Sequence, residues 1–468
     1  MHARRLNQDR NLTMRIIQML MLCLLIPVIT VAAEKQLETI THTVYVERMA
    51  AATASAWPRL ATMERLKGQT GFYAQAQILV YDGVSAWLID ANGYRAIAAG
   101  PVHALGFSSD YKSFKELLWE GQPTVYMGLG QTLPEVEARN ILNNPGAVPA
   151  LFALATHEAF HFFGQAGWQL ISGSRAGRYP LQAQPRQYRQ HVINALHASL
   201  QGDPQALGKA RYWHDRWQTE FALEAQEIRY YDILEGTAEY IEGLARTFAS
   251  VAADEPEAWA QGVMARFPSA AALSLDGESY ALGALAIYIL DRLDANGWQS
   301  IIEGQTPVQR LLANVRQSVD VPDAALNRRI AEEISERNRH LAQVIDPVIA
   351  QLKHPDTVRL MVPMSAVAGS ISMSGSYQVE EAPDEMLVDF SAQFSPSKGR
   401  VTFDRATVAL AVSEACGEKS GFVVVPITAS EFPNGPAGRL RLKGAGFEVD
   451  APFPRKGTGS EGVWCIPA

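Results

Sequence analysis

Two histidines and a glutamate near the middle of the chain have the types and spacing of a metal site. His157, Glu158 and His161 form a His-Glu-x-x-His motif within an apolar run, residues 147–163. On a helix, residues four apart lie one turn apart on the same face, so both imidazoles can reach one metal ion. Catalytic zinc takes three protein ligands and a water, and a nearby carboxylate can accept that water's proton. The motif predicts a zinc site with Glu158 as general base; the alternative is a chance match in an apolar core helix.

A second helical segment, residues 233–243, offers the third ligand. Glu235 and Glu239 are four residues apart, so both face the same side of a helix. One of them can bind the metal while the other accepts a hydrogen bond from a ligating histidine. The spacing does not choose between them, and on its own it also fits a solvated helix face.

Three short segments, in the same order, resemble those of the gluzincin metallopeptidases, nearest to their zinc aminopeptidase branch. They are the His-Glu-x-x-His motif, Leu234-Glu-Gly-Thr-Ala-Glu-Tyr240 and Tyr280-Ala-Leu-Gly-Ala284. The second is similar to the family's Asn-Glu-Gly-Phe-Ala-Glu-Tyr segment, and the third to its Tyr-x-x-Gly-Ala segment. The resemblance covers roughly residues 120–295 and is strong only in these motifs.

The resemblance assigns roles to individual residues. It implies that His157, His161 and Glu235 bind Zn²⁺, that Glu239 orients a ligating histidine, and that Tyr280 stabilises the oxyanion of the transition state. Gly236, beside the third ligand, is expected to let its helix approach the zinc helix closely.

The chain also departs from the aminopeptidase branch. Leu234 replaces the usual Asn, and the connection between the two ligand helices is longer than in that branch. The branch's Gly-x-Met-Glu-Asn segment is missing. The nearest candidate, Tyr126-Met-Gly-Leu-Gly130, lacks the glutamate that would hold a substrate's free amino group. We therefore expect cleavage within blocked peptides at least as good as removal of N-terminal residues.

The elements that must position these residues predict an α+β fold. We expect a zincin-like, mainly helical catalytic domain over residues 146–354, preceded by a mixed α/β part over residues 34–145. The latter has a helical opening and strands at residues 76–81 and 86–89. Residues 123–130 predict a further strand, which by analogy with zinc peptidases would be the sheet edge that pairs with an extended substrate. An ordinary sheet strand is the alternative.

The rest of the chain continues this pattern. Residues 164–187 predict an irregular connection, and Asp203-Pro204 predicts the start of a long helix through about Tyr231. Trp213 and Trp217 on that helix are expected to pack in the core. Further helices are predicted at residues 279–293, 306–317 and 323–353. Residues 355–468 change to short β-rich runs and predict a C-terminal β-sandwich-like domain.

The N-terminus has the pattern of a signal peptide. Residues 1–33 contain arginines, then an apolar run, then Val-Ala-Ala, so the protein is expected to be exported, either periplasmic or secreted, without stable membrane insertion after signal removal. An uncleaved N-terminal anchor is the alternative. Cys416 and Cys465 remain beyond the signal, and an oxidising compartment favours a disulfide between them over two free thiols.

Composition limits the function further. The chain is 47% hydrophobic and 19% charged with a net charge of −8, and it has no basic run, so we expect no nucleic-acid partner. The sequence predicts an exported zinc-dependent peptidase that acts on a peptide or protein substrate. The alternatives are a non-catalytic zinc-fold protein that binds through its β domain, and a zinc hydrolase of non-peptide amides or esters.

Overall fold

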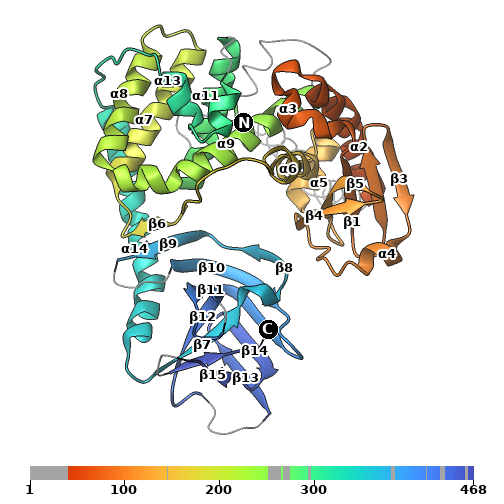
Figure 1. The fold of residues 1–468 in the computed structure, drawn as a ribbon, viewed down its shortest axis with the longest axis vertical. Coiled ribbons are helices and arrows are strands. Elements are labelled where there is room, and N and C mark those ends of the chain that lie inside the picture. The colour runs from red at the N-terminus through yellow and green to blue at the C-terminus, as the bar shows by residue number, and fades with distance from the viewer. Residues whose placement is uncertain are drawn as a thin grey trace, which may run out of the picture.

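A computed structural model describes residues 41–144, 146–250, 265–266, 275–293, 297–380, 385–417, 419–432, 438–458 and 462–467. The predicted signal peptide lies outside them. The described chain contains an N-terminal sheet, a central group of helices and a C-terminal β part (Figure 1), which confirms the predicted α+β class. Within the described residues, none of the helices combines the length and apolarity needed to cross a membrane.

The N-terminal part is a mixed sheet covered by helices. Its strands have the order β3-β2-β1-β5-β4. Only the β1–β5 pair is parallel among the pairs in this sheet. Helix α2, His42–Thr62, packs on one face through a shared apolar core, and α4, Ala99–His103, lies against the other. The strands are β1 (Gln77–Tyr81), β2 (Ala86–Asp90), β3 (Gly93–Ile97), β4 (Phe114–Trp119) and β5 (Gln122–Gly128).

The strand that we expected to form the substrate-binding edge of the sheet is an interior strand. Residues 123–130 correspond to β5, which is hydrogen-bonded on both sides, to β1 and to β4. The edge strand at this end of the sheet is β4, which is joined to β5 by a hairpin and lies outside it. Periodicity within one strand cannot reveal this, since the position of a strand depends on its partners.

The central helices follow the predicted order with one correction. The helix expected from residue 203 to 231 is two helices, because Phe221 leaves the helical conformation at φ −127° and ψ 44°. The second, α9, continues to Ser250 and carries the predicted third ligand; α7 was not predicted. Trp213 and Trp217 are buried in the core as expected. The helices are α3 (Lys67–Thr70), α5 (Glu135–Asn143), α6 (Ala150–Ala159), α7 (Ala183–Leu200), α8 (Ala206–Glu220), α9 (Ala222–Ser250), α11 (Leu275–Arg292), α12 (Trp298–Ile302) and α13 (Pro307–Leu312).

One hydrophobic core runs through the N-terminal sheet and the central helices. It joins Val46 and Trp57 of α2, Val125 of β5, Phe152 of α6 and Ile241 of α9. Apolar packing therefore continues across residue 145, where we expected one part of the chain to end and the next to begin. The two parts form a single unit around α6.

The C-terminal strands form a large, branched sheet. Its main path is β15-β16-β7-β12-β11-β10-β9-β6; β8 pairs with β10, and β14 pairs with β11 and β13. One apolar cluster lies within the β part and a second lies between the sheet and helix α14. Strand β6 comes from the helical part and runs parallel to β9. The strands are β6 (Gly177–Tyr179), β7 (Thr357–Pro363), β8 (Val367–Ser372), β9 (Gly375–Val379), β10 (Glu385–Phe394), β11 (Arg400–Ser413), β12 (Ser420–Thr428), β13 (Arg439–Gly444), β14 (Phe447–Pro452), β15 (Arg455–Lys456) and β16 (Val463–Cys465).

Helix α14, Ala324–Lys353, links the two halves of the molecule (Figure 1). Asp323 caps its start by accepting hydrogen bonds from two backbone N–H groups. Ile330 and Ile334 pack beside Leu181 of the helical part, whereas Leu341 and Ile345 pack on the sheet. Cys416 and Cys465 are joined by a disulfide within the β part.

Candidate metal centre

The His-Glu-x-x-His motif lies where an α-helix changes to a wider turn. Helix α6 begins at Ala150, directly after Pro149, and continues as a π-helical turn over Phe160–Gly164. π-helical turns inside helices are rare and are often found at functional sites. Thr156 anchors the helix from behind: its hydroxyl accepts from Trp57 Nε1 at 3.0 Å, and its carbonyl accepts from the Tyr73 hydroxyl at 2.6 Å.

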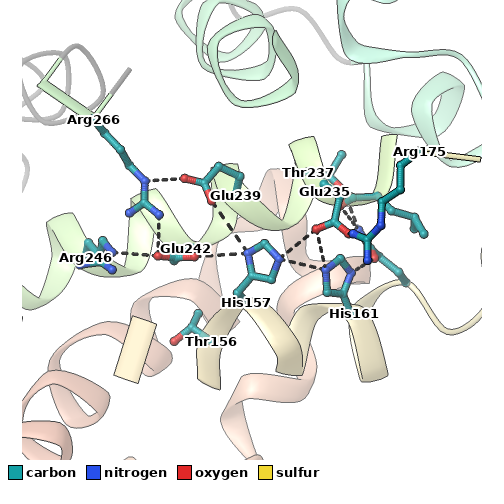
Figure 2. A network of polar contacts seen from close by, with 12 residues as sticks. Thr156, His157, His161, Arg175, Glu235, Thr237, Glu239, Glu242, Arg246 and Arg266 are labelled. Carbon is teal, nitrogen blue, oxygen red and sulfur yellow. Dashed lines mark hydrogen bonds and ion pairs between the residues drawn. The ribbon is translucent and has the colours of Figure 1, made fainter. Parts of the chain in front are cut away.

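Three predicted ligand atoms converge between α6 and α9 (Figure 2). Nε2 of His157 lies 2.9 Å from Nε2 of His161. Oε2 of Glu235 lies 3.3 Å from the first nitrogen and 3.4 Å from the second. The structure thus brings together the ligand set that the sequence predicts.

This triangle has the dimensions of a zinc ligand set. Bonds of about 2.0–2.2 Å in tetrahedral geometry separate neighbouring ligand atoms by about 3.3–3.5 Å, close to the three distances found here. A hydrogen bond joins two of these three atoms at a time, whereas a single cation can be shared by all three. Neutral imidazole nitrogens and a carboxylate are also the chemical types that zinc selects. The residues present therefore fit zinc.

The charges of the site favour a cation. Burial alone would raise the pKa of Glu235, but both histidines hold this pKa well below its usual range, so the carboxylate is ionised. Burial opposes a charge on His157, yet the carboxylates of Glu235 and Glu242 raise its pKa to about 10. The negative charge of these carboxylates would also stabilise a metal ion bound between the two histidines and Glu235.

Gln165 holds His161 in position. Nδ1 of His161 lies 2.6 Å from Oε1 of Gln165, so the ring donates to the amide oxygen and leaves Nε2 free to bind a metal. The amide nitrogen of Gln165 donates to the Leu234 carbonyl at 2.9 Å and to the Thr237 hydroxyl at 2.7 Å. Gln165 thereby ties the helix of the two histidines to α9, the helix of Glu235.

The outer nitrogen of His157 faces two buried carboxylates. Nδ1 lies 3.3 Å from Oε2 of Glu242 and 4.0 Å from Oε2 of Glu239. The closer contact is an ion pair rather than a well-aligned hydrogen bond. The sequence reasoning expected Glu239 in this role and missed Glu242, although the spacing of 235, 239 and 242 on one helical face could have indicated it.

Two arginines support this pair of glutamates (Figure 2). Arg266 bridges them, contacting Glu239 with Nε and Oε1 of Glu242 with Nη2 at 2.6 Å. Arg246 adds a contact of 2.9 Å to the same oxygen of Glu242. Burial would raise the pKa of Glu242, but His157 and the two arginines lower it, so this carboxylate is ionised beside His157. For Glu239, burial and the Glu242 charge raise the pKa.

Glu158 has the properties of a general base. Its side chain is partly exposed. Burial raises its carboxyl pKa above the ordinary value, although His161 and His157 act in the opposite direction. A raised pKa makes a carboxylate a better proton acceptor near neutral pH.

Tyr280 lies beside the ligands on α11. Its ring centroid is 5.8 Å from that of His157. Helix α11 approaches α9 closely at two glycines, because a Cβ at Gly236 would lie 2.5 Å from Cα of Gly283. The expectation that Gly236 serves contact with the zinc helix is wrong, because the glycine faces α11 instead. The glycine pair brings the helix of Glu235 against the helix of Tyr280.

A buried charge network joins three helices behind the site. Arg189 of α7 donates to both oxygens of Asp232, at 2.7 and 3.0 Å, and to Glu278 at 2.8 Å. The Ser279 hydroxyl also donates to Asp232, at 2.6 Å. Asp232 is one turn before Glu235, and Glu278 is two residues before Tyr280. The network therefore fixes the segments that carry the third ligand and the tyrosine.

Arg175 approaches the third ligand from the connection after α6. Its Nη1 lies 3.8 Å from Oε1 of Glu235, and its guanidinium lies over the ring of Tyr231 at 5.2 Å. Ser174 is held to α9 by a backbone hydrogen bond of 3.0 Å to Glu227. The predicted loop thus lies against the metal centre, and its continuation, β6, pairs with the C-terminal sheet.

Other histidines stay apart from this site. His191 stacks on Trp213 at 4.4 Å and contacts Asn327 at 2.9 Å, and His214 is buried. Both are buried residues of the core. Comparison with known proteins adds nothing to the geometry: no family model, no curated protein and no solved structure matches this chain.

Proposed function

We propose that this protein is an exported zinc peptidase of the gluzincin type. The observation that carries the proposal is the convergence of Nε2 of His157, Nε2 of His161 and Oε2 of Glu235 within 2.9–3.4 Å of one another. The order of the three short motifs resembles that family, and the same three segments meet in space.

Several residues of the chain have separate roles in amide hydrolysis. Bound zinc would lower the pKa of a water molecule and polarise the scissile carbonyl. Glu158 accepts the proton of the attacking water and delivers it to the leaving amine. Tyr280 donates a hydrogen bond to the oxyanion of the transition state. Gln165 and Glu242 hold the two imidazoles in orientation.

The edge of the N-terminal sheet supports a peptide as the substrate. Among the residues that the structure describes, strand β4 pairs with β5 alone, and its Phe114 ring is 6.3 Å from that of Phe162, directly after the motif histidine His161. An extended peptide can add to such an edge through main-chain hydrogen bonds. The non-catalytic alternative, a zinc-fold protein that only binds, leaves the general base without a role.

Export is supported by the disulfide between Cys416 and Cys465. Such bonds persist in oxidising compartments and are rare in the cytosol. The expected signal peptide agrees with this assignment.

The test combines metal analysis with digestion. The purified full chain should contain about one zinc per molecule and should cleave members of a mixed peptide library. Chelation should abolish cleavage and added Zn²⁺ should restore it. A metal-loaded protein that cleaves no peptide but hydrolyses simple esters or other amides would replace the peptidase assignment.

A further inference from the structure

A charged cavity lies where the helical part meets the C-terminal sheet. Its volume is about 380 Å³, and its walls come from β6, the start of α9, α14 and the start of β9. Tyr377 and Ser376 contribute hydroxyl groups. The described residues that line it include four arginines and two glutamates: Arg175, Arg178, Arg186, Arg337, Glu220 and Glu224.

The lining is rich in arginine and partly fixed in place. Arg186 is buried and contacts Glu224 and Glu278. Arg178 lies 3.4 Å from Glu227 with 50% of its side chain exposed, and Arg175 is 43% exposed. A guanidinium has five N–H donors, and one carboxylate oxygen uses only some of them. These exposed guanidinium groups can therefore also bind a carboxylate of a ligand, whose geometry they match.

The cavity lies beside Glu235, because Arg175 lines it and also lies 3.8 Å from Oε1 of Glu235. Glu224 lines it too and is eleven residues earlier on the same helix (235 − 224), which corresponds to about 16 Å at 1.5 Å per residue. An extended peptide covers this distance with about five residues. A ligand in the cavity can therefore belong to the same chain as the bond being cleaved.

We infer that this cavity binds the carboxylates of the substrate, so that the enzyme prefers peptides with an acidic residue or a free C-terminus within about five residues of the scissile bond. The inference rests on the proposed peptidase function and adds the class of substrate to it. An acidic side chain and a terminal carboxylate offer the same chemistry, and the experiment separates them.

The test measures peptide binding by calorimetry, on zinc-loaded full chain carrying Glu158→Gln so that no turnover occurs. The probes are two blocked hexapeptides of three alanines and three glutamates, one with the glutamates in the N-terminal half and one with them in the C-terminal half. Their neutral counterparts have glutamine in place of each glutamate. Hexa-alanine with a free C-terminus, against its amide, tests the terminal carboxylate. At least one carboxylate probe should bind about tenfold or more tightly than its neutral counterpart, the gain expected from charge-assisted hydrogen bonds.

Two paired variants assign this preference to the cavity. Arg178→Gln with Arg337→Gln should abolish the preference for acidic over neutral peptides. The matched control, Arg329→Gln with Arg439→Gln, removes two exposed arginines that are not among the residues lining the cavity, and should keep the preference. Equal binding of acidic and neutral probes, or equal loss in both paired variants, would overturn the inference.

The outcome is separable from that of the proposed function. A protein that cleaves the peptide library with no acidic preference refutes the cavity's role and keeps the peptidase. A protein that binds acidic probes through these arginines but cleaves no peptide refutes the peptidase.

Discussion

Gln165 and His161 are joined by a 2.6 Å contact between Oε1 and Nδ1, and this contact selects the tautomer that the metal site needs. Because the amide oxygen can only accept, the proton of the imidazole is on Nδ1 and the lone pair is on Nε2. Gln165 reaches α9 through its amide nitrogen, so one side chain sets both the ring and the spacing of the two ligand helices.

Gln165→Leu should therefore weaken zinc binding. Loss of such a partner typically costs about 10–100-fold in metal affinity. Competition with a chelator of known affinity measures this directly. Gln165→Glu keeps the acceptor for His161 and should lose less, and wild-type affinity in the leucine variant would show that the ring is oriented by other contacts.

The three glutamates of α9 that lie beside His157 should differ in what their loss does to the metal. Glu235→Ala should purify largely free of zinc, because it removes an atom from the ligand triangle. Glu239→Ala should retain zinc with reduced turnover. Glu242→Ala should lower turnover more than Glu239→Ala does, since Glu242 is closer to His157 by 0.7 Å (4.0 − 3.3). Metal analysis of the three purified variants distinguishes these roles. If the Glu239 variant lacks zinc and the Glu235 variant contains it, the third ligand is Glu239 and not Glu235.

The sequence could predict that His157, His161 and Glu235 meet because their signal is local. His157 and His161 share one helix, and Glu235 stands in a short Glu-Gly-Thr-Ala-Glu-Tyr segment of another, so helical periodicity and short motifs suffice. Gln165, four residues after His161, follows the same rule and was missed only because an amide is less distinctive than a histidine.

Other features depend on contacts that no local pattern carries. The edge position of β4 follows from which strands pair, and Phe221, where the helix breaks, lies with its ring 6.0 Å from that of Tyr188 on α7. Arg189, Arg175 and Arg266 reach their partners across long stretches of sequence, so their roles become visible only in three dimensions.

Glu158→Gln should keep the metal and lose peptide cleavage. The amide has nearly the same size as the carboxylate but cannot accept the proton of the attacking water. Zinc content and cleavage rate are measured on the same sample. A variant with wild-type turnover on a peptide that the parent cleaves would exclude Glu158 as the general base.

Tyr280→Phe should lower kcat by about 10²-fold or more with little change in KM, because one donor to the oxyanion is lost while substrate binding is kept. Steady-state kinetics on one peptide separates the two constants. If KM alone changes, Tyr280 binds substrate or packs, and Tyr288 on the same helix becomes the next residue to test. Its ring is 4% exposed and lines a cavity beside Glu239.

Glu278 should make the stability of the protein depend on pH. Its carboxyl is 1% exposed, and burial raises its pKa from 4.5 to about 7 against the opposing effect of Arg186 and Arg189. Between these two values the folded protein holds a proton that the unfolded chain has lost. The contribution of Glu278 to the free energy of unfolding is therefore fully present below pH 4.5 and is lost as the pH rises through about 7.

Glu278→Gln removes this contribution, since an amide does not titrate. Urea unfolding of wild type and variant at several pH values between about 4.5 and 8 gives the difference in the free energy of unfolding. The wild type should lose stability relative to the variant as the pH rises. Glu332→Gln, an exposed change on α14, should give a difference that does not vary with pH in this way. A constant difference for Glu278→Gln would mean that Arg186 and Arg189 keep this carboxylate charged across the whole range, and that the network behind Glu235 and Tyr280 carries no proton.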